Sequence, residues 1–351
     1  IGTVSRGLRG PIIKEGDDLR MIVVDTLMGC LEAGDFEIGS KDVLAVTESI
    51  LARAQKNYAT TDQLAEDVRN KLGGETVGVV FPILSRNRFA ICLRGIAKGC
   101  RKVVLMLSYP SDEVGNHLLD LDLLDEKGVN PYTDVLTQDE FEGTFGKSKH
   151  TFTDIDYVNY YKGIIEEEGA EAQIIFANNP RKIVDYTDKV ICADIHTRKR
   201  TKRLIKEAGG KVVLGMDELL TAPVNGSGYN PDYGILGSNK ATEDTIKLFP
   251  VNCQEFVESV QADIKERTGK TVEVMVYGDG AFKDPVGKIW ELADPVVSPG
   301  FTSGLIGQPN ELKLKYLADN DFADLRGNEL KAAIEGAIRE KDDNLVGQMA
   351  T

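Results

Sequence analysis

The spacing of apolar residues predicts a helix, a strand and a second helix in the first part of the chain. Apolar side chains recur at helical spacing over residues 17–31, where Gly16, Asp17 and Asp18 supply an N-cap and a negative first turn. A short apolar run follows at residues 43–46, and after three polar residues the helical spacing resumes over residues 50–55. This segment is therefore expected to form strand, polar turn and helix.

Residues 76–84 form an apolar run that predicts a buried strand. A second run, at residues 88–93, follows after three polar residues, which is a spacing typical of a hairpin loop. The two runs are therefore expected to pair as a hairpin.

Between about residues 95 and 220 the pattern changes to short apolar runs that alternate with helical sequence. The strand-like runs are residues 103–107, 173–177, 190–193 and 212–214. Helical spacing is found at residues 157–169 and 201–208. Strands that alternate with helices favour a small parallel sheet with crossover connections.

The C-terminal part begins with a glycine-rich loop at residues 223–239 and includes an amphipathic helical stretch at residues 328–341. Between them, residues 253–267 have helical periodicity, and the β-rich run 271–277 leads into Gly278-Asp279-Gly280. The sequence thus predicts a helix followed by a strand whose carboxyl end carries an aspartate.

The length of 351 residues and the 42% hydrophobic content fit about two domains with a buried core. We predict the fold class α/β, with a mixed α+β core formed by residues 1–94 together with 223–351. Residues 95–222 are predicted to form an inserted α/β module.

The net charge of −14 opposes an undirected affinity for nucleic acid or anionic membrane, so a bound polyanion must meet a local positive site. The five cysteines are scattered and include no Cys-x-x-Cys pair, which suits a reduced cytoplasm better than zinc or redox chemistry. No apolar run approaches the roughly 20 residues of a membrane span, and no signal-peptide pattern is seen at the start. We therefore expect a cytoplasmic protein.

Asp279 is the strongest candidate for chemistry, because ligand sites in α/β folds collect where strands end. Its flanking glycines would let a metal or a phosphate approach the backbone closely. Two lysines and Asp284 follow within a few residues, as a metal–phosphate site would need. The alternative is a tight turn, for which Asp-Gly is a common dipeptide.

Three other segments carry weaker signals. The backbone amides of Gly226, Gly228, Gly234 and Gly237 could cradle phosphates, or their loop could simply connect two modules. The basic run at residues 195–203, which includes His196, could bind an anion, although a solvated helix face explains such a run more often. Glu113 and His117 would share a helix face as a possible metal pair, with a plain surface helix favoured.

Three stretches carry a family pattern in order along the chain. Residues 8–19 run from Leu-Arg-Gly-Pro into Gly-Asp-Asp-Leu, and residues 42–54 pass from Val-Leu-Ala-Val through Thr-Glu-Ser. The third stretch begins with Gly-Ile-Leu-Gly-Ser-Asn at residues 234–239 and ends with Val-Tyr-Gly-Asp at residues 276–279. Together they resemble the coenzyme F420-0:L-glutamate ligase family, the γ-glutamyl ligases that extend a deazaflavin coenzyme.

The resemblance implies a metal-binding role for Asp279, nucleotide contact for Asn239 and GTP contacts for Thr47 and Arg53. The further residues expected to bind the nucleotide or the metal are Leu8, Gly10, Ser238 and Asp284. The chain departs from the family at Ser49, where a lysine is usual, at Leu236, where a second metal aspartate is usual, and at Gly280, where a threonine is usual. Asp232, Glu243, Asp244 and Asp284 are the alternatives for the missing carboxylate.

The activity that the resemblance implies is GTP- or ATP-driven amide formation with Mg²⁺ or Mn²⁺. L-glutamate would be joined to a small carboxylate acceptor, such as coenzyme F420-0 or a folate-like molecule, through an acyl phosphate. The related ligases also suggest a homo-oligomer, most simply a homodimer. The alternative is a non-catalytic nucleotide- or metabolite-binding protein derived from the same scaffold.

Overall fold

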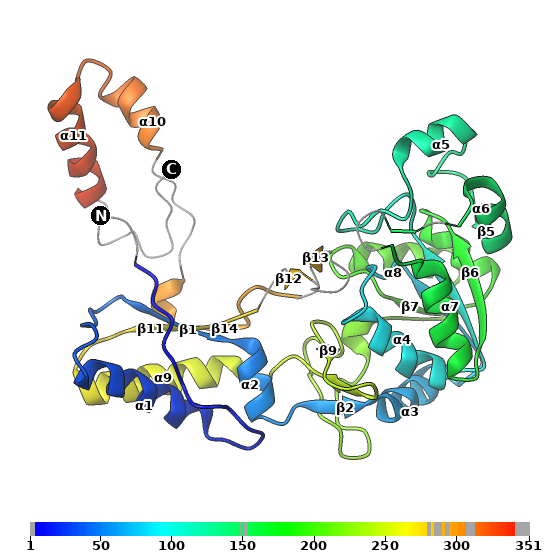
Figure 1. Ribbon diagram of the computed structural model, residues 1–351, viewed down its shortest axis with the longest axis horizontal. Coiled ribbons are helices and arrows are strands. Elements are labelled where there is room, and N and C mark those ends of the chain that lie inside the picture. The colour runs from blue at the N-terminus through cyan, green and yellow to red at the C-terminus, as the bar shows by residue number, and fades with distance from the viewer. Residues whose placement is uncertain are drawn as a thin grey trace.

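Two α/β bodies, each built on a sheet with parallel strands, make up most of the chain (Figure 1). The computed structural model describes residues 4–147, 149–150, 154–278, 282–283, 290–291, 295–306 and 313–340. The mixture of helices and strands confirms the predicted α/β class.

The first body is organised by a three-stranded sheet. Strand β1 (Val43–Thr47) pairs in parallel with β11 (Glu273–Tyr277), and β14 (Gly300–Phe301) pairs antiparallel with β11. Helices α1 (Leu19–Glu32) and α9 (Cys253–Thr268) lie along one face of this sheet (Figure 1). Segments from residues 19–54 and 253–276 therefore share one hydrophobic core.

The short helix α2 (Glu48–Ala54) follows β1 directly, and Thr47 is its N-cap. Helix α1 begins in the same way, since the Asp18 carboxylate accepts a hydrogen bond from the Met21 N–H at 3.1 Å. Both helices, strand β1 and helix α9 lie where the apolar spacing predicts them.

The second body is a six-stranded sheet in which five strands are parallel. Its order is β5 (Leu136–Thr137), β6 (Glu171–Phe176), β4 (Lys102–Leu107), β3 (Thr76–Val80), β7 (Lys189–Cys192) and β8 (Val212–Gly215). Only β5 runs antiparallel to its neighbour. The chain enters at β3 in the middle, builds β4 and β6 on one side, and then returns to build β7 and β8 on the other. The strand order therefore reverses between β3 and β7, which confirms the predicted parallel sheet and makes it doubly wound.

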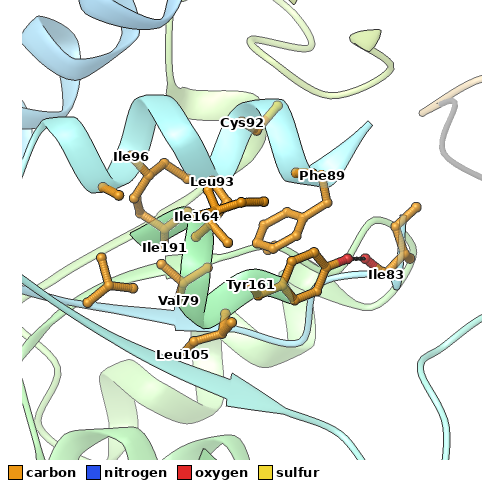
Figure 2. Packing of buried hydrophobic residues seen from close by; sticks show 14 of the residues in the cluster. Val79, Ile83, Phe89, Cys92, Leu93, Ile96, Leu105, Tyr161, Ile164 and Ile191 are labelled. Carbon is orange, nitrogen blue, oxygen red and sulfur yellow. Dashed lines mark hydrogen bonds between the residues drawn. The ribbon is translucent and has the colours of Figure 1, made fainter. Parts of the chain in front are cut away.

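Helices cover both faces of this sheet. On one face lie α3 (Thr61–Leu72), α4 (Phe89–Lys98) and α7 (Tyr157–Glu167), and on the other lie α8 (Arg198–Glu207) and the 3₁₀ helix η1 (Pro180–Asp185). Figure 2 shows the first face, where the rings of Phe89 and Tyr161 meet edge to face at 5.2 Å. Tyr161 also donates its hydroxyl hydrogen to the Ile83 carbonyl at 3.2 Å, so the loop after β3 is fixed to α7.

The predicted hairpin of residues 76–84 and 88–93 is wrong. Strand β3 pairs in parallel with β4 and β7, and the second run lies in helix α4. A short apolar run such as residues 89–93 does not tell strand from helix by its period, because all five of its side chains are buried. The proposed boundary between residues 94 and 95 falls inside α4, so the α/β module begins before it.

A small antiparallel sheet lies between the two bodies. Strand β10 (Thr245–Lys247) pairs with β2 (Tyr58–Thr60) on one side and with β9 (Asn239–Lys240) on the other. The buried side chain of Asn57 donates to the carbonyls of Tyr229 at 3.0 Å and Phe249 at 2.7 Å. The segment that leaves the first body and the segment that returns to it are thus joined at this small sheet.

The remaining described elements lie around the two bodies. They are α5 (Leu121–Lys127), α6 (Gln138–Phe145), the 3₁₀ turns η2 (Met216–Glu218) and η3 (Ser303–Leu305), the backbone hairpin β12 (Phe282–Lys283) and β13 (Trp290–Glu291), α10 (Leu314–Tyr316), the π-helical turn η4 (Leu317–Asp321) and α11 (Gly327–Glu340). Helix α11 confirms the amphipathic helix predicted near the C-terminus.

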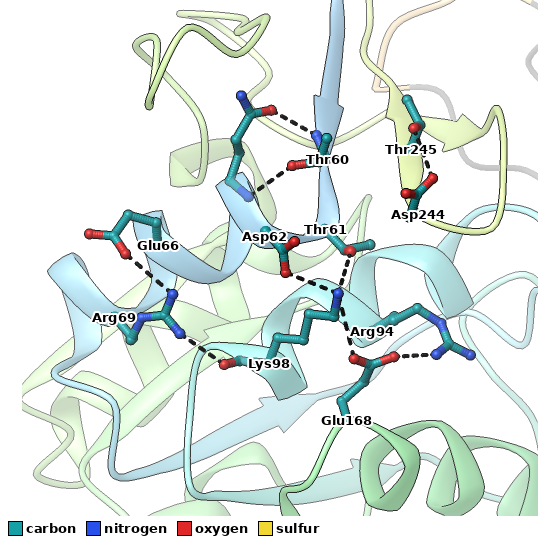
Figure 3. A network of polar contacts seen from close by, with 11 residues as sticks. Thr60, Thr61, Asp62, Glu66, Arg69, Arg94, Lys98, Glu168, Asp244 and Thr245 are labelled. Atoms are coloured by element: carbon teal, nitrogen blue, oxygen red, sulfur yellow. Dashed lines mark hydrogen bonds and ion pairs between the residues drawn. The ribbon is translucent and has the colours of Figure 1, made fainter.

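Lys98 fixes the three helices of the first face to one another (Figure 3). Its ammonium group donates to the Thr61 hydroxyl at 3.1 Å and lies 3.0 Å from the Asp62 carboxylate at the start of α3. It also lies 3.7 Å from the Glu168 carboxylate at the end of α7. One cation on α4 therefore neutralises carboxylates from both neighbouring helices.

The close approach of α3 and α4 requires a glycine at the end of α4. A Cβ atom on residue 99 would lie 2.8 Å from both the Ala65 carbonyl oxygen and the Val68 Cβ. Replacing Gly99 with Ala is therefore expected to lower the free energy of unfolding by about 1–3 kcal/mol, measured by urea denaturation. Gly163 in α7 has open space at the same atom, so Gly163→Ala should instead stabilise by about 0.5–1 kcal/mol. Equal effects of the two changes would contradict this packing argument.

Candidate functional site

The carboxyl ends of β1 and β11 lie side by side, since Thr47 is the register partner of Tyr277. Parallel strands end at the same edge of a sheet, and ligands collect at such edges. The predicted strand before Asp279 is therefore present, and its last residue lies beside Thr47. Asp279 and Asp284 lie outside the described residues, so their metal-binding roles remain predictions.

Thr47 turns the chain from β1 into α2. Its hydroxyl oxygen accepts a hydrogen bond from the Ser49 N–H at 3.3 Å, and its own backbone is extended. The hydroxyl is thereby held at the sheet edge.

Lys247 brings a positive charge to this edge. Its ammonium group hydrogen-bonds with the Ser49 hydroxyl, although the two residues lie on β10 and α2. In the antiparallel register, Lys247 also stands opposite Asn239 of β9. The structure thus brings Thr47 and Asn239, both predicted to contact the nucleotide, to the neighbourhood of one lysine. That lysine reaches the position where Ser49 replaces the family's usual lysine.

Glu48 is a functional candidate that the sequence analysis missed. Only 1% of the residue is exposed, although it follows the sheet edge at Thr47 directly. Burial raises the pKa of the Cys253 thiol to about 12, and the nearby negative charge of Glu48 adds to this rise. The signal that identified Asp279, a carboxylate at the end of an apolar strand, could also have found Glu48.

The other residues predicted for the nucleotide are not brought to this edge. Leu8 packs against the core of the first body, and a Cβ atom on Gly10 would lie 3.7 Å from the Thr26 hydroxyl of α1. Arg53 is exposed in the last turn of α2, where its charge lies near the Tyr58 phenol. Their predicted contacts with GTP gain no geometric support from the described residues.

Ser238 lines a crevice at the carboxyl ends of β3 and β7. It is buried, and its hydroxyl lies 3.3 Å from the Cys92 thiol of α4. The crevice is narrow and partly open to solvent, and it has room for about one water molecule. Its lining consists of Ile83, Arg88, Phe89, Cys92, Ala193, Ile195, Met216, Ile235, Leu236, Gly237 and Ser238. Leu236 thus contributes to an apolar wall at the position where the family usually has a metal aspartate.

The glycine-rich loop acts mainly as a connector. The Gly228 N–H donates to the Tyr58 carbonyl at 2.6 Å, and the Gly234 N–H donates to the Asn230 carbonyl at 2.9 Å. These two amides are therefore engaged within the protein, contrary to a phosphate cradle. Asn230 also donates to the carbonyls of Phe249 and Pro250, which holds the loop against the chain after β10.

The basic run at residues 195–203 is largely a salt-bridged helix face. Three of its cations, Arg198, Lys202 and Arg203, form ion pairs with Asp217, Glu218 and Glu207 respectively. His196 is exposed, and its backbone N–H donates to the Glu113 carboxylate at 3.2 Å. The solvated helix face is thus the better interpretation of this run.

Glu113 and His117 do not share a helix face. They lie in a loop closed by a bridge between Ser111 and His117, and Glu113 accepts a hydrogen bond from the Ile195 N–H at 2.5 Å. The predicted helix is wrong because Asp112 organises this segment as a loop, accepting from the N–H groups of Val114 and Asn116.

Two alternatives for the missing carboxylate lie at the tip of the β9–β10 hairpin. Glu243 forms an ion pair with Lys240 at 2.5 Å, and Asp244 accepts a hydrogen bond from the Thr242 hydroxyl at 2.7 Å. Asp232 is exposed in the connector loop. Among the described residues, no three His, Cys, Asp or Glu side chains lie close enough together to hold a metal ion.

The similarity to known proteins extends along nearly the whole chain. The family model described as F420-0:Gamma-glutamyl ligase matches residues 7–348, while no curated protein matches the chain. No described helix is long and apolar enough to cross a lipid bilayer. The family implies γ-glutamyl ligase activity on small molecules, glutamate and a carboxylate acceptor among them. The chain belongs to the F420-0:γ-glutamyl ligase family.

Proposed function

We propose that this protein uses GTP or ATP, with Mg²⁺ or Mn²⁺, to join L-glutamate to an acceptor such as coenzyme F420-0 or a folate-like molecule. The acceptor carboxylate attacks the γ-phosphorus, which gives an acyl phosphate and a nucleoside diphosphate. The glutamate amine then attacks the acyl carbon, forms the amide bond, loses a proton and releases inorganic phosphate. Charge develops on phosphate oxygens in the first step, so the site must supply positive charge.

The contact between Lys247 and Ser49 carries this proposal. It supports a phosphate-binding ammonium group beside the carboxyl end of β1, where Thr47 supplies a hydroxyl, while Asn239 stands opposite Lys247 in the register of β9 with β10. An ammonium group stabilises a phosphate through charge-assisted hydrogen bonds. In a chain with a net charge of −14, such a local cation is what a nucleotide polyanion requires. Thr47 and Asn239 would orient the nucleotide through uncharged hydrogen bonds.

Mg²⁺ and Mn²⁺ prefer oxygen ligands, and carboxylates that follow the ends of β1 and β11 are ligands of this type. Glu48 places a buried carboxylate there, and β11 leads toward Asp279 from the neighbouring strand end. We propose that Glu48 and Asp279 hold the metal, with Asp284 as the further carboxylate. When bound, the metal would screen the negative charge of the phosphate oxygens.

The setting we propose is the cytoplasm. All five cysteines are free thiols, which a reducing compartment maintains. Burial raises the pKa of Cys92 to about 11 and that of Cys100 to about 12, so neither thiol is activated as a nucleophile.

Replacing Lys247 with Gln tests the phosphate-binding site. Because the amide has no charge, the KM for the nucleotide should rise about tenfold or more. The assay measures phosphate release from GTP or ATP with Mg²⁺, glutamate and coenzyme F420-0 or folate. Lys240→Gln is the matched control, since Lys240 lies on the paired strand β9 and forms an ion pair with Glu243. An equal effect of both changes would refute the assignment.

Acceptor-dependent phosphate release by the unaltered protein is the test of the reaction itself. Nucleotide binding by calorimetry without release for any acceptor would instead favour the non-catalytic binding protein.

The metal site is tested by Glu48→Gln and Asp279→Asn, each of which keeps the side-chain volume and removes the charge. The affinity for Mn²⁺, measured by calorimetry with nucleotide present, should fall about tenfold or more in each variant. The melting temperature of Asp279→Asn should barely change. Asp232→Asn, in the exposed part of the connector, should leave the titration unchanged. Unchanged Mn²⁺ binding in Glu48→Gln would exclude Glu48 as a ligand.

We also propose that the protein forms a homodimer through the outer face of the three-stranded sheet, which is the face turned away from α1 and α9 (Figure 1). Val43, Tyr277 and Phe301 are 51%, 39% and 36% exposed among the described residues, and the strand registers put them on this outer face together with Ala45 and Met275. Adjacent exposed apolar side chains on a sheet favour burial against a second copy.

Replacing Phe301 with Asp should therefore convert the dimer to a monomer, because a carboxylate would be buried in an apolar interface. Light scattering coupled to size exclusion gives the mass. Tyr132→Asp is the control, since Tyr132 is 84% exposed and lies in the second body. A monomeric mass for the unaltered protein would disprove the dimer.

A further inference from the structure

We propose that residues 313–340, the C-terminal helical unit, cover the outer face of the three-stranded sheet in a second copy of this chain. The exchange is reciprocal, so each copy covers the sheet of the other. This inference rests on the homodimer proposed above, and it names the segment that forms the interface.

The C-terminal helical unit has no buried core of its own. It consists of α10, η4 and α11, and none of their residues is buried. It also contains no cysteine that could form a disulfide. A unit of fewer than about 40 residues usually needs a disulfide, a metal or another subunit to be stable. The unit therefore has to pack against a further surface.

Helix α11 carries the apolar side chains for such a contact. They recur at helical spacing and form one stripe, and each is partly exposed: Leu330, Ala333, Ile334, Ala337 and Ile338. The other side of the helix is polar, where the Glu335 carboxylate lies 3.9 Å from the Lys331 ammonium group and 3.7 Å from the Arg339 guanidinium. A helix of 14 residues gains most of its stability from packing of its apolar side. The stripe is thus the surface that a partner would cover.

The rest of the same copy does not hold the unit in place. In Figure 1 the unit, coloured orange to red, stands apart from both bodies on the side of the three-stranded sheet opposite α1 and α9. Within the described ranges of the chain, the hydrogen bonds and ion pairs of residues 314–340 all have their partners inside residues 313–340. The stripe is therefore available to a second copy.

The outer face of the three-stranded sheet is the complementary surface. Its inner face is covered by the amphipathic helices α1 and α9, and the outer face presents apolar side chains of the same kind. A sheet with two apolar faces is normally covered by helices on both. Pairing of two sheets alone would leave the stripe of α11 exposed, and pairing of two helical units would leave the sheets exposed. Pairing of a sheet with a helical unit covers both surfaces.

The connection to the sheet allows the exchange. Strand β14 ends at Phe301 and α10 begins at Leu314, so the connecting residues 302–313 can span at most about 40 Å. This length reaches a second copy whose sheet faces the first. Two such contacts related by a two-fold axis are identical, and they close the assembly at two chains.

A charge placed in the stripe tests the contact. Ile334→Asp would bury a carboxylate against the apolar sheet, so the mass measured by light scattering should halve. Ala332→Asp is the matched control, because Ala332 is exposed on the opposite side of α11, and this variant should keep the mass of the unaltered protein. A dimeric mass for Ile334→Asp, or an equal loss of mass in both variants, overturns the inference.

Photochemical cross-linking identifies what covers the stripe, even if Ile334→Asp does not fold. Ile338→p-benzoylphenylalanine places an apolar photoreactive group at the margin of the stripe. Irradiation should give a product of two chains on a denaturing gel, linked by mass spectrometry to residues 43–47, 273–277 or 300–301. A product of one chain linked to these strands shows that each chain covers its own sheet, and it overturns the exchange. A link to the second copy's helical unit, or no link, overturns the sheet as the partner surface.

Comparison with Phe301→Asp separates this inference from the homodimer itself. If Phe301→Asp is monomeric while Ile334→Asp remains dimeric, the homodimer stands and the exchange is overturned. A monomeric mass for the unaltered protein overturns both.

Discussion

The parallel pairing of β1 with β11 is the contact on which the rest of the structure depends. Parallel strands cannot be joined by a tight turn, so the chain leaves β1 at one edge of the sheet and must return to the opposite edge before β11 can begin. Here the crossover contains the whole six-stranded body. The outgoing and returning segments must therefore lie side by side, and the pairing of β2 with β10 and the hydrogen bonds of Asn57 join them.

This constraint explains how a lysine on one element can lie where the family usually has a lysine on another. The family's usual lysine is absent at Ser49, yet Lys247 reaches the same place from β10. Because β10 must return beside the segment that follows α2, its side chains have access to that edge. A motif compared only along the chain would therefore miss the lysine that, in our proposal, serves the nucleotide from β10. The local positive charge matters more than the element that carries it.

Elements whose apolar residues recur with a clear period could be predicted from the sequence, and elements without such a period could not. Helices α1, α7 and α9 and strands β4, β6, β7 and β8 follow from apolar spacing and from the glycine and polar residues at their ends. Strands β2, β9 and β10 have only two or three residues, too few to show alternation. Helix α3 has a pattern that predicts its start, since Thr60 and Gln63 form a capping box.

The candidate site was also predictable only where its residues belong to a pattern that is local in the sequence. Thr47 and Asn239 each belong to a short pattern that can be recognised in the sequence, whereas the contact between Lys247 and Ser49 exists only after β10 has paired. The expected GTP contact of Arg53 comes from the family resemblance, and the structure shows this side chain exposed in the last turn of α2. Proximity across the chain is set by strand register, and no local pattern encodes it.

The β9–β10 hairpin ties the proposed nucleotide site to the second body. The Thr61 N–H donates to the Asp244 carbonyl at 2.9 Å, and the Lys240 N–H donates to the Asn87 carbonyl at 2.7 Å, so the hairpin is fixed to both α3 and the loop before α4. Lys247 belongs to the same hairpin and contacts α2. A shift of the six-stranded body against the first body would therefore strain either these backbone bonds or the contact with Ser49. Rigid attachment of this kind is what the proposed phosphoryl transfer needs, because the carboxylate and the phosphorus must meet at a fixed distance.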